Sequence, residues 1–403
     1  MARSGLEVAD VFRQHGPAYR EANGSSMSSG QRRAMRSIEV CRTAALGGHV
    51  DGCDRCGYRK ITYNSCRDRH CPKCQALARA KWLEEHRAQL LEVEYFHVVF
   101  TVPEQIASIG LQNKKVVYTI LFRAASETLR RIAADPKHLG AEIGFLAVLH
   151  TWGQNLHHHP HIHCVVPGGG LSPDGHRWVA SRKGFFLSVR VLSRLFRGLF
   201  LSYLQEAFDA GKLEFHGTLA ALSDSDTFKD LMKSCRKTEW VVYSKPPFGG
   251  PAQVLEYLGR YTHRVAISND RLLKLEDGTV TFRFKDYKAG NAQKTMTLTA
   301  EEFIRRFLLH ALPSGFVRIR HYGFLANRGR AAKLGLCRTL LAGPGGNATP
   351  LPAEPVHDWK TRYEMLTGRS LDVCPACGEG RMVEIHIIEP AQRTPRPQWM
   401  DSS

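Results

Sequence analysis

Two closely spaced cysteine pairs constrain the first third of this chain more than any other feature. Cys53-Asp-Arg-Cys56 and Cys71-Pro-Lys-Cys74 are C-x2-C pairs separated by 14 residues. Each pair can form a tight turn that presents two thiolates, and two such turns can complete a tetrahedral zinc site. Cytosolic thiols stay reduced, so clustered cysteines predict metal ligands before disulfides. We therefore expect Cys53, Cys56, Cys71 and Cys74 to bind one structural Zn²⁺.

The remaining cysteines of the eleven are less informative. Cys66 and His70 lie between the two pairs and could replace one ligand or help to bind a second ion. Cys374-Pro-Ala-Cys377 has the spacing of half a zinc site, with partners that the sequence does not identify. Four cysteines stand alone, and we interpret them as small packing residues: Cys41, Cys164, Cys235 and Cys337.

The charge balance indicates a polyanionic partner. Fifty-six Lys and Arg face 38 acids, which gives a formal net charge of +18. Nucleic acid is the commonest partner of such a surplus, and an anionic membrane surface is the alternative. No run of about 18 apolar residues is present, and the first 12 residues lack a signal-peptide pattern. We expect a soluble, intracellular protein without a membrane partner.

Basic and aromatic residues surround the cysteine pairs. Residues 53–87 contain nine Lys or Arg against four acids, with Tyr58 and Tyr63 interleaved. This mixture suits phosphate contacts and base stacking. We predict that Arg67 and Arg69 contact DNA.

A histidine-rich stretch follows an apolar run in the middle of the chain. Residues 157–170 read His-His-His-Pro-His-Ile-His-Cys-Val-Val-Pro-Gly-Gly-Gly. Side chains alternate faces along a strand, so His161 and His163 share one face, about 7 Å apart. Ile162, Cys164 and Val166 take the opposite face, against the core. Two imidazoles on one face form half of a divalent-metal site with open positions for substrate.

The preceding run offers a third ligand. Residues 144–152 predict a second strand that a hairpin would carry beside the first. His150 and Gln154 share the parity of one strand face. Either of them could complete the site.

Residues 251–263 predict a helix, and Tyr257 and Tyr261, four residues apart, then share one face. Such a pair is more often a packing feature, and the nearby histidine strand makes it a candidate nucleophile pair. A phenol with its usual pKa near 10 is a poor nucleophile unless a metal polarises the phosphate and cations lie nearby. Arg260 and Arg264 supply such cations and are also predicted DNA contacts.

Strand and helix patterns do not alternate regularly, which favours an α+β fold with a mainly antiparallel sheet. We divide the chain into residues 1–92, a helical and zinc-binding DNA-recognition domain; 93–300, a catalytic domain; and 301–403, a basic C-terminal region with a Gly- and Pro-rich linker at 342–357.

Three blocks together resemble the IS91-type transposases of the HUH (His-hydrophobic-His) endonuclease superfamily. They are the cysteine block at 53–75, the histidine block at 149–171 and Tyr-Leu-Gly-Arg-Tyr-Thr-His-Arg at 257–264, and the likeness covers roughly residues 30–385. The resemblance implies an N-terminal zinc-binding domain followed by a HUH catalytic domain with an antiparallel sheet. It also implies a bacterial protein that acts in the cytoplasm, at the nucleoid.

The resemblance implies a specific chemistry as well. His161 and His163 would bind Mg²⁺ or Mn²⁺, and one or both of Tyr257 and Tyr261 would cleave single-stranded DNA through a 5′-phosphotyrosine link. No G-x-x-x-x-G-K-[ST] motif is present, so we expect no nucleotide cofactor. Three alternatives remain open: a plasmid relaxase or replication initiator, a zinc-dependent DNA-binding protein without catalysis, and a metallohydrolase that uses water. The oligomeric state is not predicted.

Overall fold

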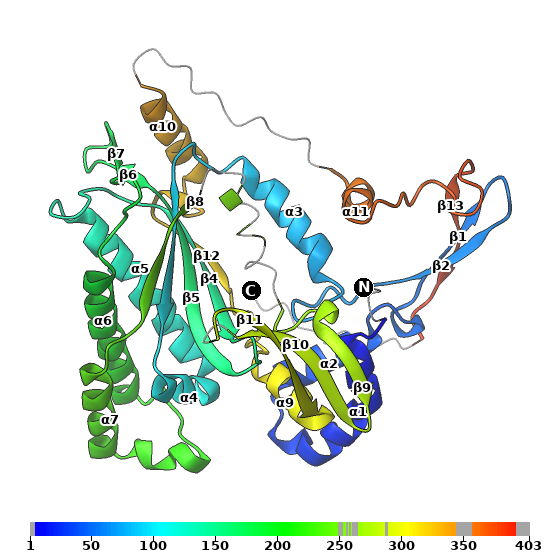
Figure 1. The fold of residues 1–403 in the computed structure, drawn as a ribbon, viewed down its shortest axis with the longest axis horizontal. Coiled ribbons are helices and arrows are strands. Elements are labelled where there is room, and N and C mark those ends of the chain that lie inside the picture. Colours follow the sequence, from blue (N-terminus) through cyan, green and yellow to red (C-terminus); the bar gives the residue numbers. More distant parts are fainter. Residues whose placement is uncertain are drawn as a thin grey trace, which may run out of the picture.

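A five-stranded antiparallel sheet forms the centre of the computed structural model (Figure 1). The structure describes residues 5–248, Gln253, Val254, Tyr257, Gly259, and residues 265–286, 289–343 and 357–391. The strand order is β12 (Ile319–Tyr322), β4 (Phe145–Trp152), β5 (His158–Pro167), β3 (Tyr95–Thr101) and β8 (Val242–Phe248). Each neighbouring pair is antiparallel.

Helices cover one face of this sheet, as Figure 1 shows. They are α4 (Glu104–Gln112), α5 (Lys114–Ala134), α6 (Val189–Asp209) and α7 (Ser225–Lys237). Alternate strand residues such as Phe100, Leu149 and Ile162 face these helices and are fully or almost fully buried. Burial of this apolar face fixes the strand register, because a shift by one residue would turn the same side chains away from the helices.

The N-terminal helices pack in a second core. α1 (Val8–Asn23) and α2 (Ser29–Val40) lie against α9 (Ala300–Leu309), where Phe12 meets Phe307 edge to face at 5.2 Å. The three-stranded sheet β11 (Ala292–Thr299), β10 (Thr279–Asp286) and β9 (Leu272–Glu276) belongs to the same core. The domain boundaries at residues 92 and 300 stay a prediction, and contacts between these elements cross both of them.

An arm on the right of Figure 1 joins an N-terminal segment of the chain to a C-terminal segment. It is a three-stranded antiparallel sheet in the order β13 (Met382–Ile388), β1 (Gly48–Cys53) and β2 (Arg59–Tyr63). Beside it, α11 (Trp359–Thr367) packs on α3 (Gln75–Arg87), where the buried Arg362 pairs with Glu84 at 2.8 Å. This ion pair holds the pKa of Glu84 below its usual value.

The remaining described elements are small. They are α10 (Arg330–Ala342), the hairpin β6 (Gly169–Leu171) and β7 (Trp178–Ala180), and the 3-10 turns η1 (Gly24–Ser26), η2 (Ala44–Leu46), η3 (Gly217–Ser223), η4 (Asn269–Arg271) and η5 (Gly323–Leu325). The triple glycine permits close packing here, because a Cβ on Gly169 would lie 2.5 Å from the Val179 carbonyl oxygen.

The α+β fold with a mainly antiparallel sheet is confirmed. Most of the linker predicted at 342–357 lies outside the described residues. Within the described ranges, every helix is too short or too polar to cross a membrane.

We predict that Phe100→Ala lowers the free energy of unfolding by about 3–5 kcal/mol, because it leaves a cavity beside Phe196, whose ring centroid lies 4.9 Å away. Urea unfolding followed by circular dichroism measures the change. Val241→Ala is the matched control, since Val241 is 64% exposed and should change stability by less than about 0.5 kcal/mol. Equal effects of both substitutions would contradict the assigned core.

Candidate functional site

Three histidines meet on the face of the central sheet that lies opposite helices α4–α7. His150 on β4 pairs directly with His161 on β5, and His163 follows two residues later on the same strand. Their ring nitrogens can all lie within 4.8 Å of one another. His150 and His163 are buried, whereas His161 is half-buried. The predicted juxtaposition of these three histidines is present.

Hydrogen bonds orient two of these rings. His161 Nδ1 lies 2.6 Å from the carbonyl oxygen of His159, which leaves Nε2 as the atom directed to a metal. His163 Nδ1 lies 2.7 Å from His97 Nε2. Such partners on the second ring nitrogen fix the tautomer of metal-binding histidines. The histidine set is therefore chemically suited to hold a divalent ion.

Gln154 is the weaker candidate for the third ligand. β4 ends at Trp152 after an irregularity in the pairing, so Gln154 lies in the following turn and not in the strand. The backbone carbonyl oxygen of Gln154 accepts a hydrogen bond from the Arg271 guanidinium. Strand alternation therefore does not extend to Gln154, and we retain His150.

His97 is a site residue that the sequence analysis missed. It lies on β3 opposite Val165, on the same face as the histidine cluster, and is buried. Its Nε2 contacts His163, while its Nδ1 lies 2.6 Å from the Tyr257 hydroxyl. The available signal was a histidine in the middle of the mainly apolar strand Tyr-Phe-His-Val-Val-Phe-Thr.

The tyrosine segment lies over this same face. Val254 packs into a small core with Tyr95, Leu146 and Val165, so the segment is anchored above β3–β5. The half-buried Tyr257 then reaches His97, with ring centroids 4.9 Å apart. The other three predicted residues of this segment lie outside the described residues: Tyr261, Arg260 and Arg264.

The cysteines group differently from the prediction of one site with Cys53, Cys56, Cys71 and Cys74. Cys71 and Cys74 meet Cys41 and Cys66, whereas Cys53 and Cys56 meet the C-terminal pair Cys374 and Cys377. The predicted single grouping is therefore wrong, because β1 and β2 carry the first pair away along the arm. Cys41 is also not a simple packing residue.

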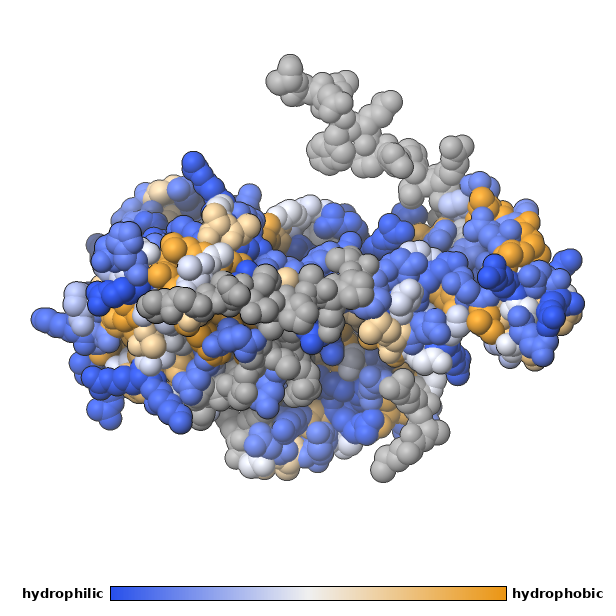
Figure 2. Space-filling model, turned by 90° about the horizontal axis from the view of Figure 1, so that it is seen from above, coloured by the Kyte–Doolittle hydropathy of each residue, from blue (hydrophilic) through white to orange (hydrophobic). Residues whose placement is uncertain are grey.

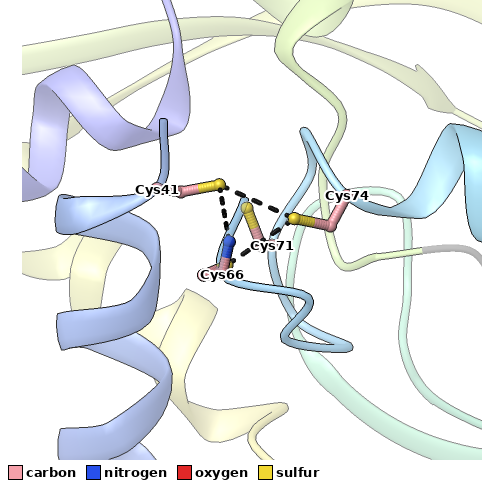
Figure 3. Close-up of side chains that lie close together, drawn as sticks. All are labelled: Cys41, Cys66, Cys71 and Cys74. Atoms are coloured by element: carbon pink, nitrogen blue, oxygen red, sulfur yellow. Dashed lines mark hydrogen bonds between the residues drawn. The ribbon is translucent and has the colours of Figure 1, made fainter. Parts of the chain in front are cut away.

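Figure 3 shows the first cysteine cluster, formed by Cys41 from the end of α2, Cys74 from the start of α3, and Cys66 and Cys71 from the loop between β2 and α3. Cys41 Sγ and Cys66 Sγ each lie 3.6 Å from Cys74 Sγ. Tetrahedral zinc with Zn–S bonds of about 2.3 Å places its sulfurs ~3.8 Å apart. Hydrogen bonding, first with Cys66, lowers the pKa of the Cys41 thiol to about 7, which favours the thiolate that binds metal.

His70 takes no part in this cluster. Its Nδ1 lies 2.9 Å from an Asp68 carboxylate oxygen, and its Nε2 accepts a hydrogen bond from the Leu312 amide. Burial lowers the pKa of His70, which suits a neutral ring with these two partners. Of the two candidate ligands between the predicted pairs, Cys66 and His70, only Cys66 belongs to the first cysteine cluster.

The two predicted arginine contacts differ in their surroundings. Arg69 is half-buried and donates to the carbonyl oxygens of Phe316 and Pro313, so its guanidinium joins the cysteine loop to the segment before β12. Arg67 is exposed and has a positive φ of 54°. Arg69 therefore has a structural role, whereas Arg67 stays a predicted DNA contact.

Comparison with protein families assigns the class. A family described as "Putative transposase" matches residues 144–333, which contain the three clustered histidines and Tyr257. A family described as "Transposase zinc-binding domain" matches residues 11–102, which contain the first cysteine cluster. These two matches define the chain as a transposase with a zinc-binding domain.

Two curated relatives agree. The chain is 63% identical over 398 residues to "Putative transposase y4qJ" of Sinorhizobium fredii (strain NBRC 101917 / NGR234), covering 98% of this chain and 99% of the relative. It is 29% identical over 305 residues to "Transposase for insertion sequence element IS801" of Pseudomonas savastanoi pv. phaseolicola, covering 73% of this chain and 72% of the relative. The chain belongs to the IS91-type transposases.

We predict that Cys41→Ser removes one zinc ion per chain, because it deletes one of the four thiolates of the first cluster. Native mass spectrometry counts the bound metal. Cys337→Ala is the control, since Cys337 is buried on α10 in an apolar cluster away from the other cysteines. An unchanged zinc content in Cys41→Ser would contradict the revised grouping.

Proposed function

We propose that this transposase nicks and rejoins single-stranded DNA at the ends of its element, with Tyr257 as the nucleophile. The observation that carries the proposal is the continuous contact from the Tyr257 hydroxyl through His97 to His163. This contact supports a phenol that attacks a phosphate held at the histidine cluster. The net charge of +18 supports a nucleic-acid partner.

A divalent metal would be held by His150, His161 and His163. Their rings fit such an ion, because their ligand atoms converge and two of the rings are oriented through their second nitrogen. Imidazole ligands favour a transition metal such as Mn²⁺ over Mg²⁺, which takes oxygen ligands. When bound, the metal would polarise the scissile phosphate and neutralise its charge.

His97 would orient Tyr257 and stabilise its phenolate. If His163 presents Nε2 to the metal, its Nδ1–H donates to His97 Nε2, and the proton of neutral His97 then lies on Nδ1. That N–H donates to the Tyr257 oxygen and stabilises the phenolate. His97 is thus a positioning residue that also lowers the energy of the charged nucleophile.

The proposed reaction is a transesterification. The Tyr257 oxygen bonds to phosphorus, and the bond from phosphorus to the 3′ oxygen of the preceding nucleotide breaks. A 5′-phosphotyrosine and a free 3′-OH result, and the 3′ oxygen takes up a proton. The reverse attack by a 3′-OH rejoins the strand. Because the phosphodiester bond is conserved as a phosphotyrosine ester, no ATP is needed.

We predict that Tyr257→Phe abolishes covalent attachment of the protein in the first cleavage, because the phenyl ring lacks the attacking oxygen. Single-stranded DNA from the element ends, labelled at the 3′ end, is incubated with the protein and Mn²⁺ and resolved on a denaturing gel. The wild type should give a slowly migrating labelled species, and Tyr257→Phe should not, while both bind the DNA equally.

Tyr261→Phe and the double variant complete this experiment. An adduct that persists in Tyr257→Phe and disappears only in the double variant would reassign the first cleavage to Tyr261. Cleavage without any adduct would favour a water-activating metallohydrolase. Binding without cleavage on verified ends and several metals would favour a non-catalytic DNA-binding protein.

We predict that His97→Ala slows cleavage by roughly 10- to 150-fold, since a hydrogen bond to a charged group contributes about 1.5–3 kcal/mol. The pH dependence of the cleavage rate should shift to higher pH, because the Tyr257 phenolate loses its hydrogen-bond donor. His97→Asn keeps an N–H near the position of Nδ1 and should recover part of the rate and of the profile. Equal defects in both variants, with no shift in the profile, would indicate a packing role only.

We predict that His150→Ala weakens Mn²⁺ binding by about tenfold or more, whereas Gln154→Ala leaves it nearly unchanged. Titration of Mn²⁺ followed by electron paramagnetic resonance measures both affinities. The reverse order of effects would make Gln154 the third ligand.

A further inference from the structure

We propose that Cys53, Cys56, Cys374 and Cys377 form a second structural zinc site, which fastens the C-terminal segment 357–391 to the N-terminal zinc-binding domain. The site combines two C-x2-C pairs that lie more than 300 residues apart, since Cys56 and Cys374 are separated by 318 positions. The zinc-binding family match ends at residue 102, so it does not contain the C-terminal pair. The proposal is independent of the nicking reaction.

The sulfur geometry fits a tetrahedral ion. Cys53 Sγ lies 3.8 Å from Cys377 Sγ, and Cys56 Sγ lies 3.7 Å from Cys374 Sγ. Both distances agree with the ~3.8 Å edge of a tetrahedral four-thiolate zinc complex. All four cysteines are free thiols, and the four sulfur atoms lie within 4.8 Å of one another.

Backbone amides surround these sulfurs as they would surround thiolates. The Arg55 and Cys56 amides donate to Cys53 Sγ at 3.4 and 3.5 Å. In the C-terminal pair, the Ala376 amide donates to Cys374 Sγ at 3.4 Å and the Gly380 amide donates to Cys377 Sγ at 3.3 Å. Both turns thus direct N–H dipoles at sulfur, which stabilises negative charge there.

The two turns also approach each other closely. A Cβ on Gly380 would lie 2.3 Å from Cys53 Sγ, so the C-terminal turn requires glycine at this position. The Arg381 amide donates to an Asp54 carboxylate oxygen at 2.8 Å, and Arg55 pairs with Glu379. These contacts hold one turn in register with the other around the sulfurs.

The sheet that carries this cluster has no hydrophobic core to hold it together. None of the hydrophobic clusters of the described residues contains a side chain from β1, β2 or β13. Figure 2 shows apolar side chains at the surface of this arm, on the right, and Ile61 and Ile387 are 56% and 61% exposed. Small units with so little burial usually depend on a metal or disulfides.

Zinc accounts for the cluster better than disulfides. The sulfur separations of 3.7 and 3.8 Å exceed the disulfide bond length of about 2.05 Å, and the four sulfurs converge in one group rather than in two separate pairs. Zn²⁺ would therefore replace the missing core of the arm and supply much of its folding energy. Its loss should release β13 from β1.

The test counts zinc on the full-length protein by native mass spectrometry. The wild type should carry two zinc ions per chain, one for each cysteine cluster, and Cys374→Ser/Cys377→Ser should carry one. Cys235→Ser is the matched control, because Cys235 is buried in the main core, and it should keep two. A His163→Ala variant identifies any zinc that enters the histidine cluster.

Hydrogen exchange of the wild type provides a second measurement that does not depend on the folding of the variant. Amides of β13 should be protected with zinc bound and should exchange rapidly after chelation. A wild-type count of one zinc would overturn the proposal. So would two disulfides detected by alkylation under denaturing conditions, or β13 amides that stay protected after both zinc ions are removed.

Discussion

The strict alternation of side chains across β3, β4 and β5 is the constraint on which the rest of the site depends. On one face, residues such as Phe100, Leu149 and Ile162 are buried against the helices, and this burial fixes the register of the strands. With the register fixed, the intervening histidines must point to the opposite face of the sheet. Packing of the apolar core thus positions the histidine side chains on the opposite face of the same sheet.

The two cysteine clusters differ in how much apolar surface is buried around them. The first cluster joins α2 to α3 beside an existing core that contains Cys41 and Cys71. The second cluster lies on an arm without such a core and combines cysteines from the N-terminal domain with cysteines from the C-terminal segment. We infer that metal binding becomes more important for stability where hydrophobic burial becomes smaller, and that the arm is a composite of N- and C-terminal segments.

Sequence patterns predicted the local parts of this account and failed where distant segments meet. The shared face of His161 and His163 follows from strand alternation over three residues, and the hairpin to His150 spans only a short turn. His97 was missed because its neighbours depend on the pairing of β3 with β5, which no local pattern encodes. The cysteine spacing gave the ligand type but not the partners. Only the fold adds Cys41 to the first cluster and supplies partners for the half-site at Cys374 and Cys377.

The central claim is that the Tyr257 oxygen becomes covalently bound to DNA. The most direct measurement is to trap the protein on element-end single-stranded DNA with Mn²⁺, digest both components, and identify the nucleotide-bearing peptide by tandem mass spectrometry. We predict a 5′-phosphonucleotide on Tyr257. A nucleotide on another residue would contradict the assignment of Tyr257. Cleaved DNA with a free 5′-phosphate and no modified peptide would contradict the tyrosine mechanism itself.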